Sequence, residues 1–519
     1  MTSPSQYQKS NQTNYSLLFA TFVIAICGLI YELLAGTVSS YLLGDSVYQF
    51  SVVIGLFMTS MGIGSFLSRF IRQHIAEAFI GIQIAIGLCG GFSAIILFYA
   101  FTYLDNYQIL LFLVSVTIGS LVGCEIPLVI RLLKEYRELR VNVSNVLTVD
   151  YLGALAASLL FPIILVPQLG LFRSSLLFGI FNVLVAGLGL YTFRANVRST
   201  VLLLVSVLLA LVTLIVGFYY VKNITHIFQS KLYSGEIIFS TNTLYQNVVV
   251  TRDGDVFSLF INGNLQFNTL DEYRYHESLV HPVMSLSRRR NDILVLGGGD
   301  GMAVREVLKY PDVQSITVVD LDPVITELFK NNEMFSRLNQ QALNDSRVTI
   351  VNDDAWKYLE AEPDLFDVII VDLPDPNDLQ LSKLYSKSFY KLATKHLAAE
   401  GIMVTQATSP LYTKEAFWCI EATLNQTPSP LHINATLYTL PYHAYVPTFG
   451  EWGFVMASFA RVNTEKMDIT VATRYLNKDI FENMREFPQD MARVDVIANT
   501  IDTHKLVHYY ESGWNKWFR

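Results

Sequence analysis

Hydrophobic residues are concentrated in the first two fifths of the chain, where seven long apolar stretches follow one another. These stretches cover residues 17–43, 50–70, 77–103, 107–133, 147–167, 173–193 and 199–220. A helix needs roughly 20 apolar residues to cross the hydrocarbon core of a bilayer. The pattern therefore predicts a transmembrane helical domain over residues 1–220 with about seven spans, the fifth of which is interrupted by Asp150, Pro162 and Pro167.

From Lys231 onward the pattern changes, because charged, glycine and proline residues recur at the density of a globular domain. Short apolar runs alternate there with helical patterns in "DILVLGGGDGMAVREVLKY", "SITVVDLDPVITELF", "RVTIVNDDAWKYL", "FDVIIVDLPDP" and "GIMVTQATSP". This alternation predicts an α/β domain over residues 291–460, with a doubly wound, Rossmann-like sheet of the methyltransferase type.

Two smaller regions flank the predicted sheet. Residues 221–290 are predicted to hold a linker, with the boundary to the apolar part at 221–230, and a small β region whose hairpin turns at Asn262-Gly263. Residues 461–519 are predicted to form a C-terminal helical tail. Because its end, "HYYESGWNKWFR", is aromatic and basic, the tail either packs on the domain, which we favour, or lies at a membrane surface.

The composition agrees with a membrane protein, because 52% of the residues are hydrophobic and only 16% are charged. A formal net charge of -8 argues against a nucleic-acid partner. The four cysteines include no CxxC pair, so neither a disulfide framework nor a zinc site is supported.

Basic residues fall in alternate loops between the apolar stretches: Arg69 and Arg72, then Arg131, Lys134, Arg137 and Arg140, then Arg194 and Arg198. The loops near Asp45 and Asp105 carry almost no positive charge. By the positive-inside rule, the basic loops and the N-terminus face the cytoplasm. Seven crossings would then leave the C-terminal domain outside and an even number would keep it inside, and the sequence leaves both open.

Two acids, Glu32 and Glu125, lie inside predicted spans. Each costs about 3 kcal/mol at a bilayer centre unless it is paired or hydrated. We favour a structural pair or a polar contact between helices, for example with Arg131, over a role in handling a cationic amine. The small residues of "MGIGSF" and "GALAAS" predict close helix packing.

Acidic residues follow the strands of the predicted sheet, at the edge where doubly wound sheets bind ligands: Asp300, Asp320, Asp354, Asp372 and Asp375. Asp300 would repel a pyrophosphate, and Met302 stands where the dinucleotide fingerprint requires glycine. A nucleoside that bears a positive charge is therefore favoured. Asp320 is placed for the ribose hydroxyls. Asp354 is placed for the adenine edge, although an N-cap is the commoner role for one such aspartate.

The proline-stiffened turn "DLPDP" holds Asp372 and Asp375 near each other after the most apolar strand. One acid would be explained by a turn stabilised by its own hydrogen bonds. Two acids that face Asp300 across one ligand site would repel one another, so they call for a cationic ligand or a shared proton.

These residues, together with "LYQNVVV", "NGNLQFNTLDEYRYHESLVHP", "LYSKSFYKLATKHLAAEGIMVTQATSP" and "VPTFGEWGF", resemble the polyamine aminopropyltransferases, or spermidine synthases. The resemblance covers about residues 231–460. The N-terminal "YELLAGTVSSYLLGDSVYQFS" resembles the membrane half of the membrane-fused bacterial form, so the whole chain resembles a multi-pass protein of the bacterial inner membrane.

The resemblance implies transfer of an aminopropyl group from decarboxylated S-adenosylmethionine to a polyamine, by default putrescine, giving spermidine and methylthioadenosine. It implies no metal, no cofactor beyond that co-substrate, contact with the lipid bilayer, and a homodimer. The implied nucleoside-binding residues are Gln246, Asp300, Asp320, Asp354 and Ala355, with Asp300 holding the ammonium of the aminopropyl arm. The implied amine-binding residues are Tyr275, His276, Asp375 and Gln406, and Asp372 matches the catalytic proton acceptor.

The sequence departs from the family pattern at several positions that bear on the acceptor. Phe449 stands where the family has a tyrosine that helps to bind the amine, so a phenol is lost unless Tyr445 or Tyr442 supplies it. Leu373 and Pro374 replace a small polar pair, and Leu379 replaces a proline. Two alternatives stay open: a membrane transporter or sensor with a non-catalytic synthase-like domain, and a methyltransferase, which Asp300 disfavours.

Overall fold

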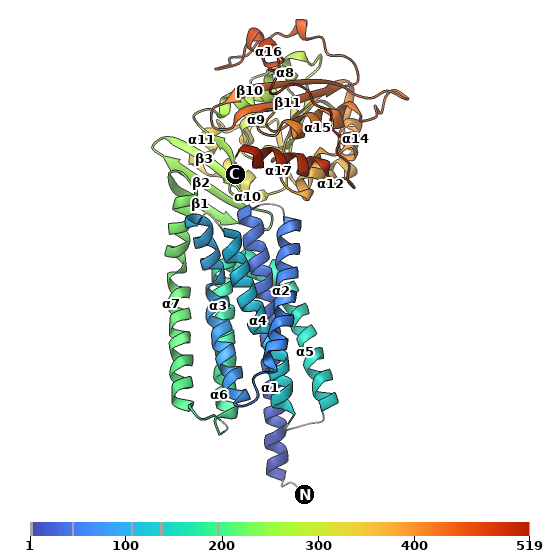
Figure 1. The fold of residues 1–519 in the computed structure, drawn as a ribbon. Coiled ribbons are helices and arrows are strands. Elements are labelled where there is room, and N and C mark those ends of the chain that lie inside the picture. Colours follow the sequence, from blue (N-terminus) through green and yellow to red (C-terminus); the bar gives the residue numbers. More distant parts are fainter. Residues whose placement is uncertain (1–3, 44–45, 105–106, 135–138, 196, 518–519) are drawn as a thin grey trace. The chain divides into compact units, whose positions relative to one another are not determined.

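The computed structural model describes residues 4–43, 46–104, 107–134, 139–195 and 197–517. The chain divides into a helical unit, Met1–Ile237, and an α/β unit, Ile238–Arg519 (Figure 1). The division lies later than the predicted 221–230, because helix α7 continues past the apolar stretch and ends at Leu232.

The helical unit contains α1 Pro4–Leu43, α2 Ser46–Ser68, α3 Ile75–Tyr103, α4 Tyr107–Leu133, α5 Leu139–Leu160, the π-helical segment η1 Phe161–Leu169, α6 Gly170–Phe193 and α7 Thr200–Leu232. Within the described residues, six helical runs are long and apolar enough to cross a membrane. The sequence pattern predicted about seven, and the difference arises because the fifth and sixth stretches join into one run, Arg140–Phe193. That run is not one straight helix, since Gly170 has φ 72° and ψ 175°, outside the helical region.

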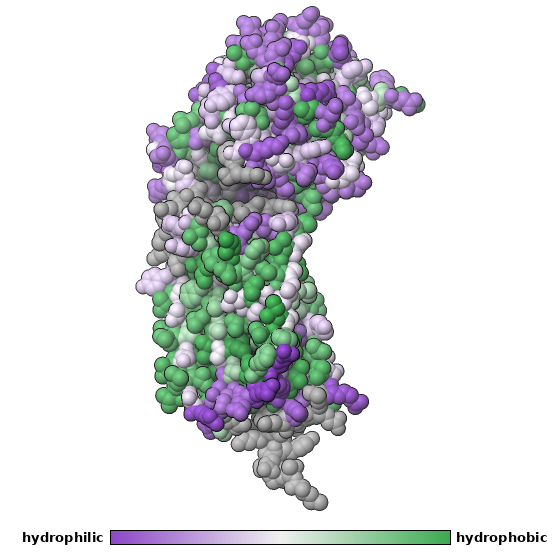
Figure 2. Space-filling model, in the orientation of Figure 1, coloured by the Kyte–Doolittle hydropathy of each residue, from purple (hydrophilic) through white to green (hydrophobic). Residues whose placement is uncertain are grey.

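Close contacts between helices hold the helical unit together. A β-carbon added at Gly64 of α2 would lie 1.8 Å from the carbonyl oxygen of Ser120 on α4, and one added at Gly153 of α5 would lie 2.8 Å from that of Phe22 on α1. The predicted role of "MGIGSF" and "GALAAS" in close packing is thus confirmed. Figure 2 shows hydrophobic residues covering most of the visible face of this unit, as a lipid-facing surface requires.

The buried acid of α4 has a polar partner on a neighbouring helix. The side chain of Glu125 is 3% exposed and accepts a hydrogen bond of 2.6 Å from Nε2 of Gln83 on α3. Arg131 instead donates to the backbone oxygens of Ser68 and Ile71, so the suggested pairing of Glu125 with Arg131 is wrong, whereas the polar contact between helices is confirmed. Glu32 is partly buried on α1. Arg137, Asp45 and Asp105 lie outside the described residues.

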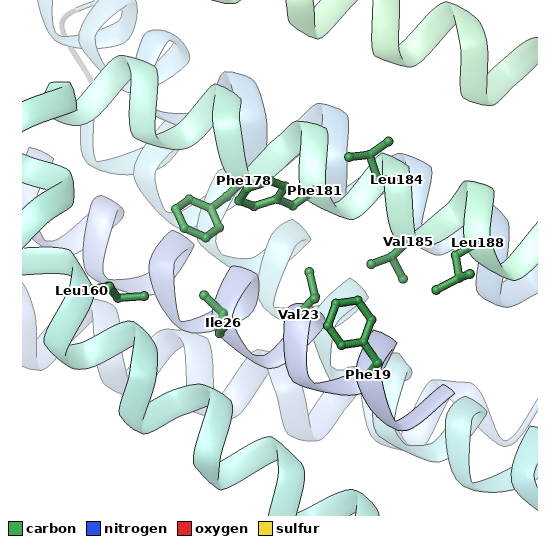
Figure 3. Close-up of a pocket in the computed structure, with 9 residues that line it drawn as sticks. All are labelled: Phe19, Val23, Ile26, Leu160, Phe178, Phe181, Leu184, Val185 and Leu188. Carbon is green, nitrogen blue, oxygen red and sulfur yellow. The ribbon is translucent and has the colours of Figure 1, made fainter. Parts of the chain in front are cut away.

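A cavity of about 440 Å³ lies between α1 and α6 (Figure 3). The side chains that line it are Phe19, Val23 and Ile26 of α1, Leu160 of α5, and Phe178, Phe181, Leu184, Val185 and Leu188 of α6. All of these side chains are apolar, so they offer neither a hydrogen-bond partner nor a counter-charge to a polyamine.

A small sheet stands at the junction of the two units in the sequence and has the strands β1 Glu236–Asn242, β2 Asn247–Asp253, β3 Val256–Ile261 and β4 Asn264–Asn268, in that order. Strand β3 is antiparallel to both β2 and β4. The predicted hairpin is confirmed between β3 and β4. Its turn residues Asn262 and Gly263 both have positive φ, 50° and 83°, as a two-residue hairpin turn requires. Helix α8, Glu272–Leu286, follows this sheet and carries several of the predicted site residues.

The large sheet has the order β10-β11-β9-β8-β5-β6-β7. Its strands are β5 Asp292–Gly297, β6 Ser315–Asp320, β7 Val348–Asn352, β8 Phe366–Asp372, β9 Leu397–Gln406, β10 Tyr438–Val446 and β11 Gly450–Ser458. Strands β5 to β9 are parallel, and β11 runs antiparallel to its neighbours β9 and β10. The predicted doubly wound α/β sheet is therefore confirmed. The strand order reverses between β5 and β8, where such sheets bind ligands.

Both faces of this sheet are buried. Ile293 and Val295 of β5 belong to one hydrophobic core, and Leu294 and Leu296 belong to the core on the opposite face. The covering helices include α9 Met302–Val307, α10 Pro323–Asn331, α11 Glu333–Leu338, α12 Ala355–Ala361, α13 Leu379–Ser382, α14 Lys387–Lys395 and α15 Lys414–Asn425. Two packed faces explain why the central strands β5 and β8 are nearly continuous hydrophobic runs.

The tail is less helical than the sequence predicted. Within residues 461–517 the α-helices are α16 Lys478–Met484 and α17 Lys505–Trp517, and most of the remaining residues have irregular structure. Helix α17 packs against α15 of the α/β unit, as the favoured alternative for the tail proposed (Figure 1).

Candidate active site

The carboxyl ends of the parallel strands form one row along the edge of the large sheet. Gly297 at the end of β5 is paired in register with Asp372 at the end of β8. On the other side of β5, Asp320 ends β6 one residue after the pair Leu296 and Val319, and Asp320 is itself paired with Asn352 of β7. The sequence prediction that these acids share one edge is confirmed.

The glycine turn after β5 lies between two of these acids. A β-carbon at Gly297, whose φ is 84°, would lie 2.1 Å from the backbone oxygen of Asp372. A β-carbon at Gly299 would lie 2.6 Å from Oδ2 of Asp320, and the N–H of Gly299 donates to that oxygen at 2.9 Å. Only glycine allows this approach. The turn therefore lies against the backbone of Asp372 on one side and the carboxylate of Asp320 on the other.

Asp300 and Asp320 are carboxylates with raised pKa values. Burial, opposed by the charge of His276 and supported by that of Asp372, raises the pKa of Asp300 to about 6. Burial also raises the pKa of Asp320 to about 6, against hydrogen bonds from the N–H groups of Asp322 and Gly299. With pKa values of about 6, both groups are mostly ionised at neutral pH. Because the charge of Asp372 raises the pKa of Asp300, the carboxyl groups of Asp300 and Asp372 lie within interaction range of each other.

Tyr275 of α8 donates a hydrogen bond of 2.7 Å from its hydroxyl to Oδ1 of Asp372. Burial raises the pKa of Asp372, whereas the charge of His276 and the hydrogen bond from Tyr275 lower it. A carboxylate with a raised pKa is a stronger base than an ordinary one, which suits a proton acceptor.

The structure also contains a buried ion-pair cluster of Glu272, His276 and Arg305, which the sequence did not predict. Glu272 accepts from Nδ1 of His276 and from Nη2 of Arg305, each at 2.8 Å. Burial raises the pKa of Glu272, but its two cationic partners lower it further, to about 2. Burial lowers the pKa of His276, but the hydrogen bond and charge of Glu272 raise it to about 9. His276, predicted to line the amine site, is therefore a cation at neutral pH.

This cluster gives a prediction for stability against pH. The His276 contribution is fully present below its ordinary pKa of 6.5 and is lost as pH rises through about 9. The Glu272 contribution is present above its ordinary pKa of 4.5 and is lost as pH falls through about 2. We expect the contribution of this cluster to the stability of the α/β unit to be greatest between about pH 4.5 and 6.5. The variant Glu272→Gln should lose about 3–5 kcal/mol there and should lack the decline above pH 6.5.

Thermal unfolding of the full chain, followed by tryptophan fluorescence, measures this effect on the correct unit, because all five tryptophans lie beyond residue 350. The matched control is Glu333→Gln, which removes a Glu at the same helical spacing from an exposed ion pair with Arg337. Equal pH profiles for wild type and Glu272→Gln would show that His276 is not held in its charged form.

Tyr385 supports the turn "DLPDP", because its hydroxyl donates to the backbone oxygens of Leu373 and Pro374 at 3.0 and 2.9 Å. Nε2 of Gln406 donates to the oxygen of Leu373 at 2.8 Å. Because both contacts are to backbone atoms, they fix the position of the turn whatever side chains it carries.

Asp375 receives three hydrogen bonds. Nε2 of Gln406 lies 3.3 Å from Oδ1, and the hydroxyls of Thr408 and Tyr510 lie 3.3 and 3.0 Å from Oδ2. Burial raises the pKa of Asp375 to about 6 although all three hydrogen bonds lower it. The family resemblance had assigned Gln406 and Asp375 to the same amine site, and the structure brings these two side chains into contact. The sequence prediction missed Thr408, and it missed Tyr510 because 135 residues separate it from Asp375.

The predicted adenine- and nucleoside-binding residues lie at the neighbouring part of the same edge. Nε2 of Gln246, in the turn between β1 and β2, donates to Oδ2 of Asp322 at 3.0 Å. Asp354 caps α12 by accepting from the N–H of Trp356 at 2.8 Å, as its N-cap interpretation requires. Its other oxygen faces Lys383 at 3.4 Å. Ala355 is the buried first residue of α12.

Two tyrosines, Tyr442 and Tyr445, were suggested to supply the phenol that is missing at Phe449. Tyr442 is fully buried, and its hydroxyl donates to the backbone oxygen of Ser278 at 2.9 Å, so that suggestion is wrong. Tyr445 is 50% exposed. Phe449 packs edge-on against Tyr275, with ring centroids 6.0 Å apart.

Comparisons with known proteins show which family this chain resembles. The Spermine/spermidine synthase domain matches residues 272–468. The chain is 44% identical to the polyamine aminopropyltransferase of Leptospira interrogans over 501 residues, which cover 96% of this chain and 99% of that protein. It is 45% identical to polyamine aminopropyltransferase 2 of Ralstonia nicotianae over 514 residues, which cover 97% and 99% of the two chains. It is also similar to a crystal structure of spermidine synthase from Thermotoga maritima, at 23% identity and a TM-score of 0.44, with 49% of this chain and 85% of that chain covered.

Proposed function

This chain belongs to the polyamine aminopropyltransferases, enzymes that transfer an aminopropyl group, and on that premise we propose that the strand-end acids carry out the transfer from decarboxylated S-adenosylmethionine to putrescine. The observation that carries the proposal is the register of the sheet. It pairs Asp372 at the end of β8 with Gly297 of the glycine turn, and it puts Asp320 on the other side of β5.

The donor occupies the part of the edge around β5 to β7. Asp320 accepts hydrogen bonds from the ribose hydroxyls, and Gln246, Asp354 and Ala355 hold the nucleoside and its adenine. Asp300, ionised above about pH 6, pairs with the ammonium of the aminopropyl arm. The carboxylate that ordinary S-adenosylmethionine carries on this arm would face Asp300 and be repelled.

The reaction is an in-line displacement in which a C–N bond forms and the C–S bond breaks. Its electron pair passes to sulfur, which leaves as a neutral thioether. The attacking amine must be uncharged, yet with a pKa near 10.4 more than about 99.9% of it is protonated at neutral pH, a cost of roughly 4–5 kcal/mol. Asp372 accepts the proton of the attacking nitrogen, and Tyr275 holds the carboxylate in place. Asp375 binds the ammonium at the other end of the diamine, and proximity supplies much of the remaining acceleration.

We also propose that the enzyme lies in the bacterial cell membrane, in contact with lipid. The long apolar helices and the exposed apolar side chains of the helical unit support this location. The family also suggests a homodimer. Fractionation of cells and the particle mass in detergent test these two points. We expect the chain in the membrane pellet and, in detergent, a particle of twice the protomer mass. A chain in the soluble fraction would contradict the membrane location, and a monomer would contradict the homodimer.

The proposed function is tested by incubating the purified full chain with decarboxylated S-adenosylmethionine and a panel of diamines. We expect methylthioadenosine and the aminopropylated amine in equal amounts, with putrescine the best acceptor. Polyamine binding without any thioether would instead indicate a sensor or transporter. Methyl transfer from ordinary S-adenosylmethionine would indicate a methyltransferase.

A further inference from the structure

The acid assigned to the acceptor end of the site is contacted by a residue of the C-terminal tail. The Tyr510 hydroxyl on α17 donates to Oδ2 of Asp375 at 3.0 Å. Tyr510 lies beyond the region that matches the Spermine/spermidine synthase domain, which ends at residue 468. The tail therefore adds a polar group to this end of the site that the matched domain does not contain.

The hydrogen bonds to Asp375 orient its carboxylate without neutralising it. Their donors are the amide of Gln406 and the hydroxyls of Thr408 and Tyr510, all uncharged. A carboxylate has about four acceptor positions, so three donors leave room for another. Because these three donors are neutral, the carboxylate of Asp375 keeps its negative charge and is suited to bind a cation.

Specific packing fixes α17 where Tyr510 can reach this acid. Gly513 lets the helix lie against the loop after β9, since a β-carbon there would be 2.7 Å from Cα of Thr413. The next residue, Trp514, stacks on Tyr412 of the same loop, with ring centroids 5.3 Å apart. The loop also carries Thr408, so both hydroxyls that bind Oδ2 come from a single packed assembly.

A second anchor lies just before α17. Asn499 is fully buried, and its side-chain amide donates to the backbone oxygens of Ser382 and Tyr385 at 2.9 and 3.3 Å. Its Oδ1 accepts from the N–H of Leu506 at the start of α17. The tail is thus bound to the segment that supports the "DLPDP" turn, and Tyr510 and Asp375 are held on a common frame.

We propose that α17 is part of the acceptor site, and that Tyr510 is a positioning residue which holds Asp375 so that it binds the distal ammonium of an α,ω-diamine. This inference rests on the proposed function and extends it to the tail. It assigns the affinity and the length preference for the acceptor to a segment outside the matched domain. The donor, which lies at β5 to β7, is unaffected by Tyr510.

The variant Tyr510→Phe tests this proposal, because it removes one hydroxyl and keeps the ring that packs. We expect the KM for putrescine to rise roughly tenfold, as for loss of one hydrogen bond to a charged group, while kcat and the KM for decarboxylated S-adenosylmethionine change less than about twofold. Discrimination between putrescine and diamines one methylene longer or shorter should weaken. The hydrogen bond from Tyr510 lowers the pKa of Asp375, so its loss should raise that pKa. The increase of the putrescine KM at low pH should therefore begin at a higher pH in the variant.

Tyr509→Phe is the matched control. It removes the same atom from the adjacent residue, whose hydroxyl accepts from the N–H of Ile497 at 3.4 Å, and it should leave both KM values unchanged. Both variants are measured as full chains, with thermal unfolding showing that each is folded. If Tyr510→Phe keeps the wild-type KM, pH profile and chain-length preference for the acceptor, the proposal is overturned. If wild type itself forms no methylthioadenosine, the proposed function fails instead, so the two failures are distinguishable.

Discussion

Replacing Asp372 with asparagine is expected to lower kcat by roughly 10²–10⁴-fold, the range typical for loss of a general base. Asparagine has nearly the shape of aspartate and its side-chain oxygen can still accept the hydrogen bond from Tyr275, but it cannot take a proton from the attacking amine. The affinity for the donor nucleoside should change little, because the ribose and adenine residues lie on other strands. Single-turnover formation of methylthioadenosine measures the chemical step, and equilibrium dialysis measures donor binding.

Asp364→Asn is the control for this experiment. Asp364 is exposed and lies just before the opposite end of the same strand, β8, so its replacement removes the same charge from the unit without touching the edge. It should keep wild-type kcat. Wild-type turnover by Asp372→Asn would mean that another group accepts the proton, and a loss of donor binding equal to the loss of kcat would mean that Asp372 is a binding residue.

The second large effect is expected at Asp300. Asp300→Asn removes the charge that pairs with the ammonium of the donor but keeps the oxygen that accepts from the N–H of Met302 at 2.9 Å. The lost charged hydrogen bond is worth about 1.5–3 kcal/mol, so the KM for decarboxylated S-adenosylmethionine should rise roughly 10–150-fold. Binding of ordinary S-adenosylmethionine should improve, because its carboxylate no longer meets a negative charge.

The pH dependence of wild type supplies an internal check on Asp300. Its pKa is raised to about 6, so the group loses its charge as pH falls through that value. Donor affinity should therefore fall below about pH 6 in wild type, and the fall should be smaller in Asp300→Asn, which keeps the ribose acid Asp320 with its own pKa of about 6. A variant that still prefers the decarboxylated donor by the wild-type factor would show that a different residue selects it.

The sequence was sufficient to predict the sheet and its ligand-binding edge. Strands buried on both faces are apolar along their whole length, and the acids that follow them stand out against that background. Because parallel strands end at one edge, the prediction that Asp320 and Asp372 lie in one row needed only the order of the elements. The hairpin at Asn262-Gly263 was predictable for a similar reason, since the turn geometry restricts the residue types.

Contacts between distant segments could not be predicted in the same way. Tyr510 meets Asp375 only because α17 packs on α15, and no periodicity links those positions. The pairing of Glu272 with His276 did leave a signal, because residues four apart share a helix face, but Arg305 comes from another helix. The partner of Glu125 was misjudged for the same reason: Arg131 is near in sequence, whereas Gln83 is near in space.

The most direct test of the central claim is a structure of the full chain with decarboxylated S-adenosylmethionine bound. The account predicts adenine beside Asp354 and Ala355, ribose hydroxyls on Asp320, the aminopropyl ammonium on Asp300, and the carbon next to sulfur facing Asp372. Donor bound away from this edge of the sheet, or bound with Asp372 remote from that carbon, would contradict it.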